Sequence, residues 1–151
     1  MAAQLSDVDV IIGGDSHSLL GDFSTLGLSS AGPYPTVVKN KEGDLVCIGQ
    51  AWEYAKVFAL MQVHFNRRGA VESCAGQASL VLGSAFQRQG SDKAWRSLNA
   101  EQSAELVSAL SRQPAVKVVE PDASAQAVLQ RYTERMAQEK NKTIGTASEA
   151  L

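Results

Sequence analysis

The sequence predicts an α/β protein in which a β-rich first half is followed by helices. Between residues 8 and 83, short runs of alternating apolar and polar residues are separated by glycine-containing turns, a pattern typical of strands. From residue 99 onward, apolar residues instead repeat at helical spacing. The chain has 151 residues, of which 44% are hydrophobic and 20% charged, so it is long and apolar enough to bury a sizeable core.

The first predicted strand, Val8–Ile12, is almost continuously apolar, as strands buried on both faces are. Two glycines let the backbone turn after it, and Asp15 and His17 follow. In an extended segment residues i and i+2 project to the same side. We therefore expect Asp15 and His17 to reach a pair of metal ions ~3.5–4 Å apart, the spacing of two-metal hydrolases. The alternative is an ordinary turn with His17 on the surface.

A long loop and a hairpin are expected next. Residues 18–35 are rich in Gly, Ser and Pro and form a loop beside the candidate site. The strands predicted at 36–39 and 45–49 flank a five-residue connection that contains a glycine, which indicates a hairpin.

A second hairpin is predicted around Arg67-Arg68-Gly69. Residues 58–65 alternate with a period of two, and the turn leads into a strand at 70–75. We expect His64 to face solvent or to pack against a partner, and residues 84–99 to form a polar connection. The set that should face the core comprises Ala59, Met61, Val63 and Phe65.

Two helices are predicted in the second half. Asn99 with Gln102 three residues later forms a capping box, and Pro114 ends the first helix. A short apolar run at 116–119 follows. Asp122 then caps a second helix, whose apolar stripe consists of Ala125, Val128, Leu129, Tyr132 and Met136.

The two cysteines, Cys47 and Cys74, each fall in a predicted strand. Their spacing excludes a zinc ribbon and a dithiol redox motif. Two interpretations remain open: each is a small buried hydrophobe, or the two form a disulfide in an oxidising compartment.

Composition and hydropathy exclude several classes of protein. The net charge of −2 argues against a nucleic-acid partner, since phosphate contacts require a positive surface. No apolar stretch approaches the ~20 residues that span a bilayer. The first residues lack the basic region and apolar core of a signal peptide, so none is expected in this chain.

Four motifs in order resemble the 5′-nucleotidase family of metallophosphoesterases. The first is the strand and turn from Val8 to His17, and the second is the Gly-Pro-Tyr-Pro segment from Gly32 to Val38. A strand start at Gln50-Ala51-Trp52 and the turn at 63–69 complete the set. Asp15 stands where most of the family has histidine. This form resembles the NAD nucleotidase branch, which cleaves nucleotide pyrophosphates and 5′-nucleotides outside the cytoplasm.

The resemblance implies a fold and a division into domains. The chain would supply the second half of a four-layer αββα metallophosphoesterase sandwich. Residues 1–98 would be the C-terminal portion of the catalytic domain, and residues 99–142 a helical segment ending in a linker helix. Residues 143–151 would begin a truncated substrate-binding domain.

The resemblance also implies a metal-dependent nucleotide phosphohydrolase of the 5′-nucleotidase or nucleotide pyrophosphatase type. Its substrate would be AMP or an NAD-like nucleotide, and its cofactors two divalent ions (Zn, Mn, Co or Mg). Asp15 would ligate one metal and His17 the other. No catalytic residue is assigned and most of the family's metal ligands are missing, so we expect the chain to be weak or inactive alone. The family setting implies a periplasmic or cell-surface location.

The alternative hypothesis is a non-catalytic, β-rich interaction module. Such a module would bind a partner, or associate with itself, through apolar surface that nothing in the chain covers.

Overall fold

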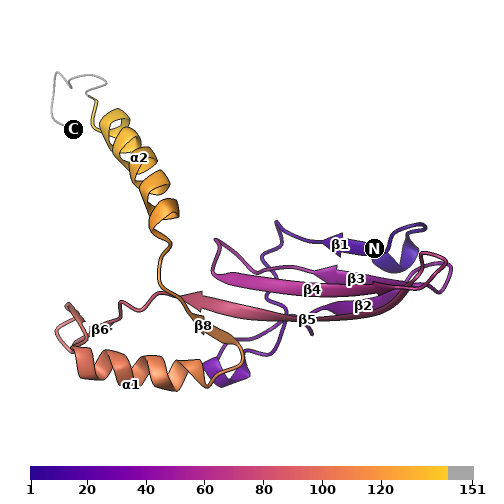
Figure 1. Cartoon of the computed structure of the whole chain (residues 1–151), viewed down its shortest axis with the longest axis horizontal. Coiled ribbons are helices and arrows are strands. Elements are labelled where there is room, and N and C mark those ends of the chain that lie inside the picture. Colours follow the sequence, from indigo (N-terminus) through magenta and orange to yellow (C-terminus); the bar gives the residue numbers. More distant parts are fainter. Residues whose placement is uncertain (143–151) are drawn as a thin grey trace, which may run out of the picture. The chain divides into compact units, whose positions relative to one another are not determined.

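The computed structural model describes residues 1–142, and the chain divides into two compact units, Met1–Val119 and Glu120–Leu151 (Figure 1). Within residues 1–142, the first unit is β-rich and carries one α-helix, and the second contains one α-helix. The chain is thus a small α/β protein with strands followed by two helices, as predicted. The segment 143–151, predicted to begin another domain, lies outside the described residues.

The first sheet has the strand order β1-β3-β2. Strand β1 (Val10–Ile12) is parallel to β3 (Leu45–Gly49), with Ile12 opposite Gly49. Strand β2 (Thr36–Lys39) is antiparallel to β3 and forms the predicted first hairpin with it. Asn40 closes this hairpin, because its Oδ1 accepts the backbone N–H groups of the residues at positions 42 and 44.

The second sheet has the order β4-β5-β8. Strand β4 (Val57–Phe65) is antiparallel to β5 (Val71–Leu82), which confirms the second hairpin, and β8 (Val116–Val118) is parallel to β5. Of the residues predicted to face the core, Ala59, Met61 and Val63 are partly buried, while the opposite set is exposed. Phe65 was predicted wrongly: it is 50% exposed, because the pairing register shifts between His64 and Phe65.

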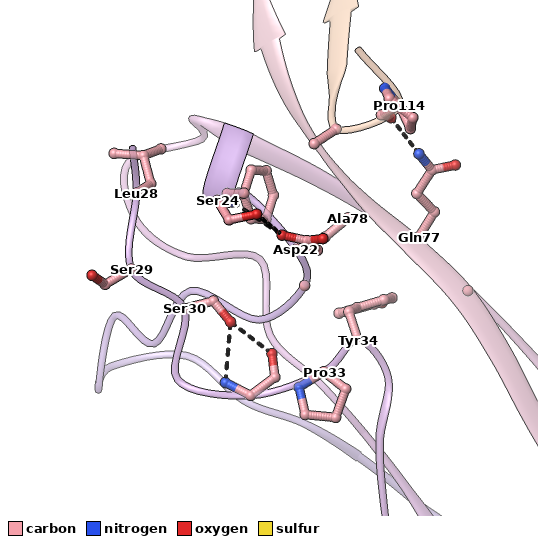
Figure 2. Close-up of a pocket in the computed structure, with 15 residues that line it drawn as sticks. Asp22, Ser24, Leu28, Ser29, Ser30, Pro33, Tyr34, Gln77, Ala78 and Pro114 are labelled. Carbon is pink, nitrogen blue, oxygen red and sulfur yellow. Dashed lines mark hydrogen bonds between the residues drawn. The ribbon is translucent and has the colours of Figure 1, made fainter. Parts of the chain in front are cut away.

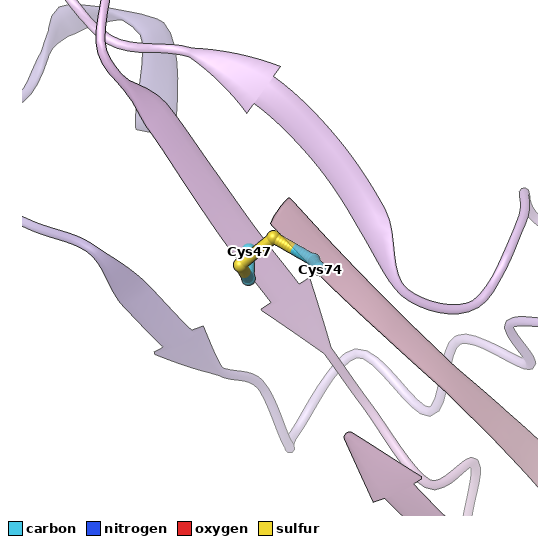
Figure 3. The surroundings of a disulfide bond; sticks show 2 residues. All are labelled: Cys47 and Cys74. Carbon is cyan, nitrogen blue, oxygen red and sulfur yellow. A yellow bond between two sulfur atoms is a disulfide. The ribbon is translucent and has the colours of Figure 1, made fainter. Parts of the chain in front are cut away.

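A disulfide and a tyrosine ring lie where the two sheets meet. A disulfide links Cys47 on β3 to Cys74 on β5, with the Cα atoms 6.0 Å apart (Figure 3). The ring of Tyr34 lies against Gly49 of β3 and Gly76 of β5. A methyl group at Gly49 would be 3.1 Å from Tyr34 Oη, and one at Gly76 would be 3.0 Å from Tyr34 Cε1. At Gly76 a methyl group would also clash with the backbone oxygen of Leu60, so glycine is required there, whereas at Gly49 only the tyrosine ring is close.

The hydrophobic core lies beside this junction. Its central side chains come from the loop after β1, from β4 and β5, and from the residue just before β8. They are Leu19, Phe23, Val57, Ala78 and Ala115.

The first strand differs from the prediction. Val8–Ile12 was expected to be buried on both faces, but the strand spans only Val10–Ile12 and Ile12 is 74% exposed. The reason is its place in the sheet: within residues 1–142, β1 pairs only with β3 and forms an edge. A continuous apolar run indicates a strand, but it does not say which neighbours cover that strand.

The polar connection also differs from the prediction. Residues 84–99 contain a short antiparallel hairpin of β6 (Gln87–Gln89) and β7 (Trp95–Ser97). Its strand residues are all exposed, so the sequence contains no apolar alternation that would predict these strands.

Both predicted helices form with the expected caps. Helix α1 (Ala100–Ser111) begins with the capping box, in which the Gln102 backbone N–H donates to Asn99 Oδ1 at 2.8 Å. In the second unit, Asp122 caps α2 (Ala123–Lys140) by accepting the N–H of the residue at 125. In the described part of the chain, neither helix combines the length and apolarity needed to cross a lipid bilayer. The short 3₁₀ segments are η1 (Ala2–Gln4) and η2 (Ser24–Leu26).

Removing the disulfide is expected to destabilise the first unit. The two cysteines are 27 residues apart, and closing a loop of that size contributes about 3.5 kcal/mol by restricting the unfolded chain. We therefore expect the Cys47→Ala/Cys74→Ala protein to unfold at lower urea concentration than the wild type. Dithiothreitol should lower the wild-type midpoint and leave the variant unchanged; equal midpoints for oxidised and reduced wild type would contradict the assignment.

Candidate functional site

The residues after β1 form a turn rather than an extended segment. Asp15 and His17 both have left-handed backbone, with φ of 27° and 50°. The prediction that they project to one side of an extended chain is therefore wrong, because side chains alternate in that way only along a strand. The Ser16 hydroxyl donates to Gln50 Oε1 at 3.1 Å, which ties the turn to the end of β3.

Gln50 contacts this turn at both Gly13 and Ser16. Its side chain is buried, and a methyl group on Gly13 would lie 2.6 Å from Gln50 Oε1. Gly13 therefore allows the amide to approach the backbone. Within residues 1–142, the buried Gln50 Nε2 has no hydrogen-bond partner.

The segment after Gln50 forms the other wall of the site. The sequence motif there was expected to begin a strand, but Trp52, Tyr54 and Ala55 have left-handed backbone with φ of 55°, 48° and 56°. Together with Asp15 and His17, these are five of the seven non-glycine residues with positive φ in the described chain. Strained backbone of this kind clusters where packing holds functional side chains in place.

The imidazole of His17 contacts both a carboxylate and an aromatic ring. Its Nδ1 lies 3.3 Å from Glu53 Oε2, and its ring meets that of Tyr54 edge-on with centroids 5.2 Å apart. The His17 side chain is still 46% exposed.

Lys56 holds the same carboxylate from the other side. Its Nζ is 2.5 Å from Glu53 Oε1 and 4.8 Å from the centre of the Trp52 ring. The hydrogen bond from Lys56 is the main reason why the pKa of the Glu53 carboxyl lies below its ordinary value, and His17 lowers that pKa further. Glu53 therefore carries its charge at neutral pH.

The donor chemistry of the turn fits a divalent cation only in part. The Asp15 carboxylate has no hydrogen-bond or ion-pair partner within residues 1–142, and His17 has one ring nitrogen that does not face Glu53. Oxygen and imidazole ligands suit Zn²⁺, Mn²⁺ or Mg²⁺. The described residues nevertheless contain no cluster of three or more His, Cys, Asp or Glu side chains able to hold a metal ion.

A separate open pocket of about 820 Å³ lies between the loop after β1 and strand β5 (Figure 2). Asp22 borders it, but its Oδ1 accepts the backbone N–H and the hydroxyl of Ser24 and so serves the local turn. Burial raises the pKa of Tyr34, another lining residue, which keeps its phenol neutral. Neither Asp15 nor His17 lines this pocket.

Sequence reasoning found Asp15 and His17 but missed Gln50 and Glu53. Gln50 had been noted only as part of a motif. Their place follows from the sheet topology. The residues that follow two parallel strands lie at the same end of the sheet, and β1 and β3 are parallel. That pairing was not predicted.

Comparison with known proteins finds similar sequences among the 5′-nucleotidases. The chain is 32% identical over 135 residues to a probable 5′-nucleotidase of Treponema pallidum, covering 87% of this chain and 23% of that protein. It is 28% identical over 146 residues to the NAD 5′-nucleotidase of Haemophilus influenzae, covering 92% and 24%. The chain is homologous to the 5′-nucleotidase and NAD nucleotidase family. No family model matches it, and it spans about a quarter of the length of these curated relatives.

Two solved structures of related proteins share the fold of this 5′-nucleotidase homologue. The NAD nucleotidase of Haemophilus influenzae superposes with a TM-score of 0.81 at 25% identity, covering 96% of this chain and 29% of that one. A 5′-nucleotidase precursor from Thermus thermophilus gives 0.61 at 32% identity, covering 95% and 22%.

Two neighbouring glycines provide a matched test of the turn. Gly13→Ala should displace the Gln50 amide and break its bond to Ser16, lowering the free energy of unfolding by about 1 kcal/mol. It should also shift the NMR signals of His17. Gly14→Ala is the control, because a methyl group there meets no atom within 4 Å. If the two variants behave alike in urea unfolding and in NMR, the contact between Gly13 and Gln50 does not organise the turn.

Proposed function

We propose that the chain forms the C-terminal part of the catalytic domain of a metal-dependent nucleotide phosphohydrolase. In this proposal it supplies the second half of a four-layer αββα sandwich, with residues 1–98 in the catalytic domain and residues 99–142 leading toward a substrate domain. The substrate is AMP or an NAD-like nucleotide. The observation that carries the proposal is a carboxylate and an imidazole on strained backbone after β1, in a chain homologous to 5′-nucleotidases.

Asp15 and His17 are the proposed metal ligands. Asp15 offers a charged oxygen and His17 an imidazole nitrogen, and both stand on a turn anchored to β3 through Ser16 and Gln50. Divalent ions held by Asp15 and His17 would supply Lewis-acid chemistry, since they would polarise phosphoryl oxygens and lower the pKa of a bound water molecule. We assign no general acid to this chain.

Two protein ligands do not complete two coordination shells, so we propose that the chain is weak or inactive alone. We also propose a periplasmic or cell-surface location. The disulfide between Cys47 and Cys74 supports that location, because such bonds persist in oxidising compartments.

A chimera tests the catalytic proposal. Residues 1–142 replace the matched segment of the Haemophilus influenzae NAD 5′-nucleotidase, and hydrolysis of AMP and NAD is measured with Mn²⁺, Co²⁺ or Zn²⁺. We expect measurable turnover by the chimera and background turnover by the chain alone, because only the chimera completes the set of metal ligands.

His17→Ala and Asp15→Ala should each abolish most of the chimera's activity. His64→Ala is the matched control, since His64 is the other histidine and lies exposed on β4. An active chimera that tolerates His17→Ala would rule out the proposed ligands. Robust turnover by the chain alone would refute its inertness and leave the ligand assignment standing.

A second candidate function, a self-associating module, is favoured by exposed apolar side chains on β4. Phe58 is 63% exposed and Leu60 is 58% exposed. Because they alternate along the strand, they lie on the same face of the sheet. An apolar face of this kind is suited to bind another copy of the chain.

Sedimentation velocity over a wide range of protein concentration tests this second function. If the face of β4 binds another copy, Leu60→Ser should shift the chain toward monomer. Gln62→Ser is the control, because it changes a polar residue on the same face of the same strand. A wild-type chain that stays monomeric at every concentration would argue against this function.

A further inference from the structure

We infer that Glu53 is a positioning residue for His17: it holds the imidazole in the tautomer that carries its proton on Nδ1 and leaves Nε2 free for a metal ion. This inference deepens the proposed function and rests on it for the identity of the ligand. It assigns a role to a residue that the sequence did not single out.

The contact between the two side chains sets the tautomer. Nδ1 of His17 lies 3.3 Å from Oε2 of Glu53. An ionised carboxylate only accepts hydrogen bonds, so it favours the tautomer in which the nitrogen that faces it carries the proton. In a neutral imidazole the other nitrogen, Nε2, then carries no proton. Its lone pair is free to bind a metal ion.

Lys56 fixes the carboxylate in the orientation that this contact needs. It binds Oε1 at 2.5 Å, which leaves Oε2 for His17, so the two oxygens have separate partners. The ammonium is held in turn over the rings of Trp52 and Tyr54, at 4.8 and 5.6 Å from their centres. The Glu53 side chain itself is 22% exposed.

Tyr54 restrains the imidazole from a second direction. Its ring meets that of His17 at an interplanar angle of 65°. A carboxylate on one ring nitrogen and an aromatic edge against the ring restrict its rotation, while almost half of the side chain remains open to solvent. Carboxylates that orient metal-binding histidines in this way tune the affinity of the site.

The tautomer can be measured without any metal. In the metal-free full chain, long-range ¹H–¹⁵N NMR at a pH where histidine is neutral should show the His17 proton on Nδ1. Glu53→Ala should shift the balance toward Nε2–H. Glu53→Gln should largely preserve the wild-type pattern, because its amide oxygen still accepts from Nδ1. The signals of His64 serve as the internal control and should be the same in all three proteins.

Metal affinity provides the second measurement, with Mn²⁺ alone as the probe and in the chimera, because only the chimera completes the set of metal ligands. We expect Glu53→Ala to weaken Mn²⁺ binding by about 10- to 100-fold, the usual effect of losing such a partner. Glu72→Ala, which removes an exposed carboxylate from β5, is the control and should bind as the wild type does. Circular dichroism verifies that each variant is folded.

The two measurements separate the possible failures. An unchanged His17 tautomer in Glu53→Ala, or Mn²⁺ affinity within twofold of the wild type, overturns the positioning role. Mn²⁺ binding that is unaffected by His17→Ala overturns the proposed ligand instead. In that case the tautomer comparison alone decides whether Glu53 controls the imidazole.

Discussion

Strand β3 is the element on which the rest of the structure depends. It pairs with both other strands of its sheet, and its Cys47 is bonded to Cys74 in the second sheet (Figure 3). Both segments of the candidate site leave this sheet at one end, because β1 and β3 are parallel and Ile12 is opposite Gly49. This is why Ser16 and Gln50 meet although they are 34 residues apart in the chain. A change in the position of β3 would separate the two halves of the site.

The elements that the sequence predicted well are those decided by local chemistry. The turn at Asn40 and the capping box at Asn99 depend on side chains that bond the backbone within four residues, so a short window contains the whole cause. The alternation along β4 is equally local. Features that depend on distant partners were misjudged or left open: the exposure of Ile12 follows from the edge position of β1, and the choice between free cysteines and a bond from Cys47 to Cys74 depends on how two sheets meet.

In the candidate site, too, the residue types were predicted from local sequence, but their geometry depends on distant residues. Asp15 and His17 stood out because their residue types suit metal ions, but their geometry was predicted from an extended backbone that the chain does not adopt. Left-handed backbone at a residue other than glycine is held by tertiary packing. Here that packing comes from Gln50 and the loop after it, which no local pattern connects to the first turn. Glu53 was missed for this reason, although its charge lies next to the imidazole.

Two exposed surfaces relate to the two candidate functions: the free edge of β1 lies near the candidate metal ligands, and the apolar face of β4 suits self-association. An edge strand presents unpaired backbone N–H and C=O groups to any strand that lies alongside. A strand that pairs in parallel with the free edge of β1 would end beside the turn that carries Asp15, so the residues after it would approach the same site. Phe58 and Leu60 belong to β4 in the other sheet, which shares no strand with the sheet of β1. Covering Phe58 and Leu60 would therefore bury surface without completing a metal site, whereas pairing at β1 would extend the sheet toward the candidate ligands.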